Sequence, residues 1–160
     1  MFSSVFGSIY NPTEETIEIN GKKISMINAC ATRMSLALLN ANYNLNSKRD
    51  FLCQTGKYRG KGIITKIKKM RDYLFESIGS PDIFISTEDE KSPYYGRTRQ
   101  ISEEEVRKII GYKNGIYLVY RPGAYTDANG HVSLWLKREM NTIDNPDTGV
   151  IGELCFWELT

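Results

Sequence analysis

Residues 28–40 have the sequence NACATRMSLALLN, and this stretch decides how the fold is predicted. A short extended run, Ile24 to Ile27, precedes it, and residues 31–39 are mostly good helix formers without Gly or Pro. The pattern predicts a helix from about Cys30 to Asn40. Its apolar residues form a wide stripe, which is typical of a helix that lies largely buried in the middle of a domain.

Cys30 is placed at or next to the first turn of this predicted helix. The free N–H groups of a first turn and the positive end of the helix dipole favour the nucleophilic thiolate over the thiol. Cysteine is also among the residue types most often buried and chemically inert. The helix alone therefore leaves both a catalytic and a structural interpretation of Cys30 open.

Length and composition indicate one ordinary globular domain over residues 1–160. The chain is 41% hydrophobic and 25% charged, and it is long enough to form a core without metals or disulfides. Its apolar runs are much shorter than a membrane span requires. The first residues lack a basic start and a sustained apolar core, so we expect no secretory signal peptide.

The chain has three cysteines, Cys30, Cys53 and Cys155, and one histidine. None of the cysteines has CxxC spacing, so we expect no structural zinc site, and nothing in the sequence indicates a cofactor. An odd number of cysteines leaves at least one thiol free, and we expect that thiol to be Cys30. A disulfide between Cys53 and Cys155 stays open.

A formal net charge of +2 is too small to indicate nucleic-acid binding. Most of the local positive charge falls between Lys48 and Arg71, partly on a predicted helix. Two interpretations stay open for this segment. It is either a solvated helix face or a region weakly attracted to an anionic polymer such as bacterial cell wall.

The remaining pattern predicts helices first and an antiparallel meander afterwards, which makes the chain an α+β protein. The predicted elements are a hairpin around Asn20-Gly21, a long loop over residues 42–60, helices over 62–78 and 102–111, a short strand over 81–86, a charged loop over 87–100, and strands over 116–120, 131–137 and 150–159. Ser102 and Glu105 form a capping box for the third helix.

His131 opens the strand His131-Val132-Ser133-Leu134-Trp135-Leu136 directly after Gly130. Alternation places His131 and Trp135 on one face of that strand. A lone histidine is more often structural, but imidazole titrates near neutral pH and can take a proton from a thiol. Together, Cys30 and His131 favour a cysteine hydrolase.

Several motifs resemble those of one known family. They are Asn28-x-Cys30-Ala31-x-Arg33-Met34-Ser35-x-Ala37-Leu38, Tyr73-Leu74 with Gly79-x-Pro81-Asp82, Gly115-Ile116, Gly130-His131-Val132-x-Leu134-Trp135, and Phe156-Trp157-Glu158-Leu159. In this order they resemble the fourth family of type VI secretion amidase effectors, within the papain-like cell-wall peptidases. The resemblance implies a papain-like cysteine peptidase core, in which N-terminal helices, one bearing the nucleophile, pack on a C-terminal antiparallel sheet.

The resemblance also implies a reaction and a set of site residues. The reaction is hydrolysis of the amide between D-glutamate and meso-diaminopimelate in peptidoglycan stem peptides. Cys30 would attack the carbonyl, His131 would accept and return the proton, and the Cys30 N–H would be one oxyanion donor. The family carries an aspartate after the histidine strand. Asp144 is the predicted third residue and Asp147 the alternative, although residues 141–149 are also rich in turn formers.

As a member of this family, the protein would be made in the cytoplasm, exported by the type VI secretion apparatus and active in the periplasm of a target cell. A dedicated immunity protein would occlude its cleft. No nucleic-acid partner or membrane span is expected. Two alternatives stay open: a catalytically silent papain-like module that binds cell-wall peptides or a partner protein, and a papain-like transferase or deamidase.

Four further residues of the matching motifs are predicted to be structural. Arg33 is placed to hold neighbouring loops, and Ser35 packs within the helix. Trp135 and Trp157 are predicted to lie in the core instead of forming sugar-stacking platforms.

Overall fold

The computed structural model describes residues 16–19, 22–25, 30–87, 90–91, 102–120, 130–142 and 152–159. The chain forms two compact units, Met1–Ile78 and Gly79–Thr160, and each is described by itself. The single domain predicted over residues 1–160 stays a prediction. None of the helices in the described part of the chain is both long and apolar enough to cross a membrane.

The first unit begins with the predicted hairpin. Strand β1, Thr16–Ile19, pairs antiparallel with β2, Lys22–Ser25, and Ile19 lies opposite Lys22. This register leaves two residues, Asn20-Gly21, between the strands. Asn-Gly is the pair that two-residue hairpin connections favour, so the predicted hairpin is confirmed.

Helix α2 spans Cys30–Asn40, as predicted. Its buried side chains occur on nearly every side, and Met34, Ala37 and Leu38 are completely inaccessible. The helix contacts both α3 and β4 within the first unit, and its Leu36 packs with Cys53 and Ile63. The prediction of a largely buried helix is therefore confirmed.

Two predictions in residues 42–78 were wrong in detail. The predicted loop contains strand β3, Phe51–Leu52, which pairs antiparallel with β4, Gly62–Ile63, and the second helix, α3, spans only Ile67–Ser77. Ile63 and Ile64 match the helical period, but they are buried in and just after β4. A strand of two residues is too short to show an alternating pattern. The helical period of α3 therefore seemed to continue through β4, and the predicted helix began too early.

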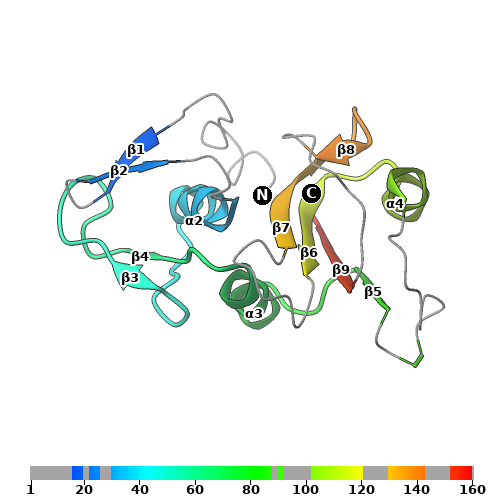
Figure 1. Ribbon diagram of the computed structural model, residues 1–160, viewed down its shortest axis with the longest axis horizontal. Helices are drawn as coiled ribbons and strands as arrows, with labels where there is room; N and C mark the ends of the chain where they lie inside the picture. The colour runs from blue at the N-terminus through cyan, green and yellow to red at the C-terminus, as the bar shows by residue number, and fades with distance from the viewer. Residues whose placement is uncertain are drawn as a thin grey trace. The chain divides into compact units, whose positions relative to one another are not determined.

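The second unit contains one described sheet and one helix. The elements are β5 Ile83–Ser86, α4 Glu103–Ile110, β6 Gly115–Tyr120, β7 Gly130–Leu136, β8 Asn141–Thr142 and β9 Glu153–Glu158. All described strand pairs are antiparallel, and the order is β5-β9-β6-β7-β8 (Figure 1).

Strand β9 corrects the predicted meander, because it lies between β5 and β6 instead of following β7. Its side chains from Leu154 to Trp157 are all buried, so both faces of this inner strand are covered. A continuous apolar run is typical of such a strand. The order of strands along the chain does not show that the last strand inserts between β5 and β6.

Helix α4 covers one face of this sheet (Figure 1). The packed cluster consists of Ile85, Val106, Ile110, Tyr117, Trp135, Leu154 and Phe156. The Ser102 hydroxyl accepts a hydrogen bond from the Glu105 N–H, as predicted, and Gly111 follows the helix with a φ of 70°. The predicted loop over residues 87–100 lies almost entirely outside the described residues.

Trp135 and Trp157 are buried, which confirms that they belong to the core. Each indole N–H has a backbone acceptor: Trp135 donates to the Gly111 carbonyl at 3.2 Å, and Trp157 to the Gly79 carbonyl at 2.8 Å. A buried indole with a satisfied N–H stabilises the core without leaving an unpaired donor.

Candidate active site

Cys30 is the first residue of α2, as predicted. Its side chain is half-buried, and the thiol is free. The first turn of α2 contains no acidic residue that would oppose a thiolate. The thiol therefore lies at the N-terminus of a helix, where the first N–H groups have no partner within the helix.

The other two thiols are poorly suited to catalysis. Cys53 and Cys155 are buried, and both thiols are free. Burial raises the pKa of the Cys53 thiol, which disfavours its thiolate. Within the described residues, no cluster of side chains is arranged to hold a metal ion. Cys30 is thus the one thiol of the chain that keeps access to solvent.

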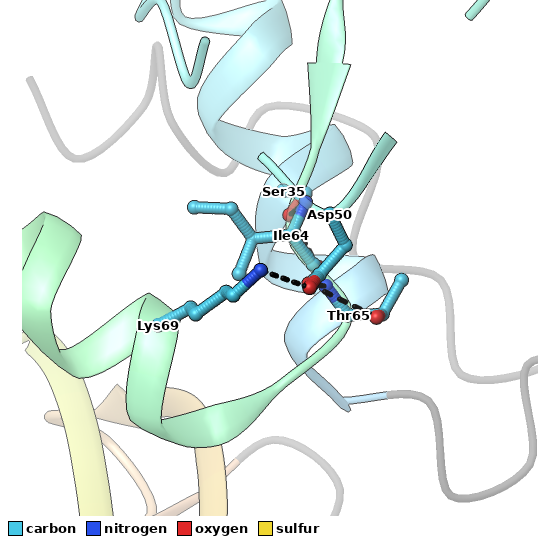
Figure 2. Close-up of polar contacts among 5 residues, drawn as sticks. All are labelled: Ser35, Asp50, Ile64, Thr65 and Lys69. Carbon is cyan, nitrogen blue, oxygen red and sulfur yellow. Dashed lines mark hydrogen bonds and ion pairs between the residues drawn. The ribbon is translucent and has the colours of Figure 1, made fainter. Parts of the chain in front are cut away.

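Ser35 fixes the helix that carries Cys30 (Figure 2). Its fully buried hydroxyl accepts a hydrogen bond from the Ile64 N–H at 3.0 Å. Its single proton has two acceptors within reach, the Ala31 carbonyl at 2.9 Å and the Ile64 carbonyl at 2.8 Å. Ser35 therefore joins the first turn of α2 to the segment after β4, a stronger structural role than the predicted packing within the helix.

Arg33 lies one turn after Cys30 on the same helix. It is half-buried, and its Nε is buried with no hydrogen-bond partner among the described residues. The role predicted for it, holding neighbouring loops, stays a prediction.

Asp50 fixes the start of α3 (Figure 2). Its carboxylate accepts hydrogen bonds from the Thr65 N–H at 2.7 Å and the Thr65 hydroxyl at 3.0 Å, and it pairs with the Lys69 ammonium at 2.6 Å. The N-cap residue Lys66 has no side-chain cap of its own. A carboxylate from another segment thus supplies the negative charge that a helix N-terminus favours.

Asp50 makes the stability of the first unit pH-dependent. Burial acts to raise its pKa, but the hydrogen bonds from Lys69 and Thr65 and the ammonium charge outweigh burial, so the net pKa is lowered. A carboxyl whose pKa is lower in the folded state stabilises the fold above its unfolded pKa, about 4. That contribution is lost as the pH falls through the lower, folded pKa.

We expect Asp50→Asn to lower the free energy of unfolding by about 1–3 kcal/mol at neutral pH. The loss should be smaller at about pH 2 than at neutral pH, because the stabilisation from the wild-type carboxylate declines below its unfolded pKa of about 4. Urea unfolding at both pH values measures this difference. Asp72→Asn is the matched control, because Asp72 makes longer ion-pair contacts, 3.3 Å to Arg71 and 3.9 Å to Lys68. An equal loss for Asp50→Asn at both pH values would contradict the assignment.

His131 is the second residue of β7 and lies opposite Val119 of β6. Its side chain is half-buried. The predicted alternation is confirmed, since Trp135 lies in the cluster under α4 and Val119 packs against that cluster. His131 therefore lies near the N-terminus of β7, on the sheet face that α4 covers.

The predicted third residue and its alternative, Asp144 and Asp147, lie outside the described residues. Cys30 belongs to the first unit and His131 to the second, so their pairing stays a prediction. The sequence did not indicate the contacts of Asp50 and Ser35, because their partners lie 15 to 29 residues away along the chain.

Solved structures that resemble this chain include effectors of effector-immunity complexes. The effector in the Tae4-Tai4 effector-immunity complex from Enterobacter cloacae is 24% identical, with a TM-score of 0.57 over 82% of this chain and 74% of that chain. The Salmonella typhimurium effector, solved with its immunity protein as a selenomethionine variant, is 25% identical, with a TM-score of 0.56 over 82% and 73%. Among curated proteins, none matches this sequence.

The fold defines the class of protein. The chain is an α+β protein with the papain-like fold of the amidase effectors, as predicted. Residues 26–157 match the family model described as type VI secretion system (T6SS), amidase effector protein 4. The match covers most of the chain. The protein belongs to this family of amidase effectors, which confirms the resemblance stated from its motifs.

Proposed function

We propose that this protein is a peptidoglycan amidase that cleaves the bond between D-glutamate and meso-diaminopimelate in stem peptides. The observation that carries this proposal is the accessible thiol of Cys30 at the start of α2, in a chain of the amidase effector family. Cys30 is the proposed nucleophile, His131 the proposed base and acid, and Asp144 the proposed orienting residue.

The proposed reaction has two steps. His131 accepts the thiol proton, the Cys30 sulfur attacks the D-glutamyl carbonyl carbon, and the carbon–nitrogen bond breaks as His131 protonates the leaving amine of diaminopimelate. Water, deprotonated by His131, then attacks the thioester and releases the D-glutamyl carboxylate and the Cys30 thiol. The Cys30 N–H, unsatisfied within the helix, is placed to donate to the oxyanion.

Strand β8 shows that the chain turns back beside the strand that carries His131. Thr142 lies opposite Trp135 and Asn141 opposite Leu136, so β8 runs toward the His131 end of β7. Along the chain, Asp144 follows β8 by two residues and Asp147 by five, so Asp144 is the preferred third residue.

We expect Asp144→Asn to lower kcat by about 10²–10⁴-fold, because an asparagine no longer stabilises the imidazolium or sets its tautomer. Asp147→Asn is the matched control, because Asp147 is an aspartate of the same short segment. This substitution should change kcat less than about threefold. The measurement is steady-state cleavage of a soluble muropeptide. The reverse order of the two effects would assign the role to Asp147.

The proposed biological role is that of an antibacterial effector toxin. It would be exported by a type VI secretion apparatus and act on the wall in the periplasm of a target cell, with a cognate immunity protein occluding the cleft. The support is family membership, together with the effector-immunity complexes in which similar effectors were solved.

Purified protein incubated with diaminopimelate-type muropeptides tests the reaction, with mass spectrometry of the products. Fragments cut between D-glutamate and diaminopimelate support the proposal, and fragments cut elsewhere would contradict the assigned bond. Binding without cleavage by the wild-type protein would indicate a catalytically silent module. Side-chain deamidation or transfer products would indicate the papain-like transferase or deamidase.

A further inference from the structure

Positive charge is strongly concentrated in one segment of this chain. Residues 48–71 contain nine Lys and Arg against one Asp, whereas the other residues contain twelve Lys and Arg against eighteen Asp and Glu. The small net charge of +2 therefore hides a strongly basic segment in an otherwise acidic chain. Such an asymmetry is typical of proteins that contact an anionic partner.

The structure gathers part of this charge around one hairpin. The basic hairpin, as defined here, comprises the exposed side chains of Arg49, Lys57, Arg59, Lys61 and Lys66. Strands β3 and β4 pair antiparallel, and two bonds close the loop between them: the Cys53 N–H donates to the Lys61 carbonyl, and the Gly60 N–H to the Cys53 carbonyl, each at 2.9 Å. Lys57, Arg59 and Lys61 belong to the segment between the two strands, Arg49 lies two residues before β3, and Lys66 lies three residues after β4 at the N-terminus of α3.

The ion pairs in this segment involve its other basic residues. They are Lys48–Glu76, Lys68–Asp72, Lys69–Asp50 and Arg71–Asp72. Within the described residues, none of the five side chains of the basic hairpin forms an ion pair. The single acid of the segment, Asp50, is already bonded to Thr65 and Lys69. The charge of the hairpin is therefore available to a ligand.

We propose that the basic hairpin binds the carboxylates of peptidoglycan stem peptides along the intact wall and so holds the enzyme on its insoluble substrate. The choice of polymer rests on the proposed function. A single exposed ion pair contributes only about 0–1 kcal/mol, but several weak contacts with a repeating polymer add up through effective concentration. Such binding must weaken with salt, because exposed charges are screened within about one Debye length.

A wall polymer fits this surface better than nucleic acid does. Sites for single-stranded nucleic acid combine basic side chains with aromatic faces on which bases stack. The loop of the basic hairpin contains one aromatic residue, the half-buried Tyr58, and the Lys57 ammonium lies 5.4 Å from the centre of its ring. Carboxylates need charge alone, which the five side chains supply.

The test is co-sedimentation of the full chain with insoluble peptidoglycan sacculi. All proteins carry Cys30→Ala, so that the polymer stays intact and the result does not depend on turnover. The hairpin variant combines Lys57→Gln, Arg59→Gln, Lys61→Gln and Lys66→Gln. The matched control, Lys108→Gln, Lys113→Gln, Lys137→Gln and Arg138→Gln, removes the same net charge from the second unit.

We expect the apparent Kd for sacculi to rise about tenfold or more in the hairpin variant and less than about twofold in the control at about 50 mM salt. The difference in apparent Kd between the hairpin variant and its parent should largely vanish at about 300 mM salt. Thermal unfolding checks that each variant is folded. A hairpin variant that does not fold is replaced by Lys57→Gln with Arg59→Gln in the loop, for which a rise of about threefold is expected.

Three results would overturn the inference: equal binding of the hairpin variant and its parent, an equal loss in the control, or tighter binding to a DNA oligonucleotide or an acidic protein than to sacculi. Failure of the proposed function is recognised separately. In that case soluble muropeptides stay uncut by the wild-type protein, whatever the sacculi assay gives.

Discussion

Cys30→Ala is expected to abolish amide cleavage, lowering kcat by at least about 10⁴-fold while the protein stays folded. The proposed covalent step has no substitute nucleophile, because Cys53 and Cys155 are buried. The substitution itself is mild, since Cys30 is half-buried at a helix start and makes no disulfide. The measurement is muropeptide cleavage followed by mass spectrometry, with circular dichroism and thermal unfolding of the variant.

Cys53→Ala is the matched control for Cys30→Ala. Cys53 packs with Leu36 and Ile63, so its truncation should cost about 1–2 kcal/mol of stability and leave kcat within about twofold. Iodoacetamide should inactivate the wild-type protein with one adduct, on Cys30. Cleavage by Cys30→Ala at more than about one hundredth of the wild-type rate would remove Cys30 from the mechanism.

The sequence predicted those elements whose signal is local. Helix α2 has an uninterrupted run of helix formers, and α4 begins with a capping box and ends at a glycine, so both were found with nearly correct bounds. The Asn20-Gly21 hairpin was found for the same reason. Each of these signals lies within about ten residues.

The missed features depend on contacts that are distant in sequence. Strands β3 and β4 have two residues each, too few for a period, and burial of Ile63 in β4 imitated the helical pattern of α3. The position of β9 in the sheet depends on pairing with β5, about 70 residues earlier. The bonds of Asp50 also join segments whose spacing carries no pattern.

The candidate site also combines local features, which the sequence predicts, with features that depend on distant segments. The helix start at Cys30 and the strand start near His131 are local features: α2 begins at Cys30 as predicted, and β7 begins at Gly130, one residue before the predicted start. The pairing of these residues, and the choice between Asp144 and Asp147, are tertiary features. Periodicity cannot predict these features, and they stay predictions from the family resemblance.

His131→Ala is expected to lower kcat by about 10³–10⁴-fold, because the variant has no group to accept the thiol proton and protonate the leaving amine. A second readout separates this role from substrate binding. An imidazole paired with a thiol promotes the thiolate near neutral pH, so His131→Ala should slow alkylation of Cys30 by iodoacetamide at about pH 6 by about tenfold or more. The buried thiols of Cys53 and Cys155 keep this signal specific to Cys30.

Ser133→Ala is the control on the same strand, because Ser133 is buried two residues after His131 on the same side of β7. Its loss changes packing in the sheet without removing a base, so we expect alkylation of Cys30 at about pH 6 to stay within about twofold. Added imidazole should restore part of the activity of His131→Ala, since a free base can enter the space that the side chain leaves. Loss of cleavage with unchanged alkylation and no rescue would instead assign His131 to substrate binding, and a different group would have to activate Cys30.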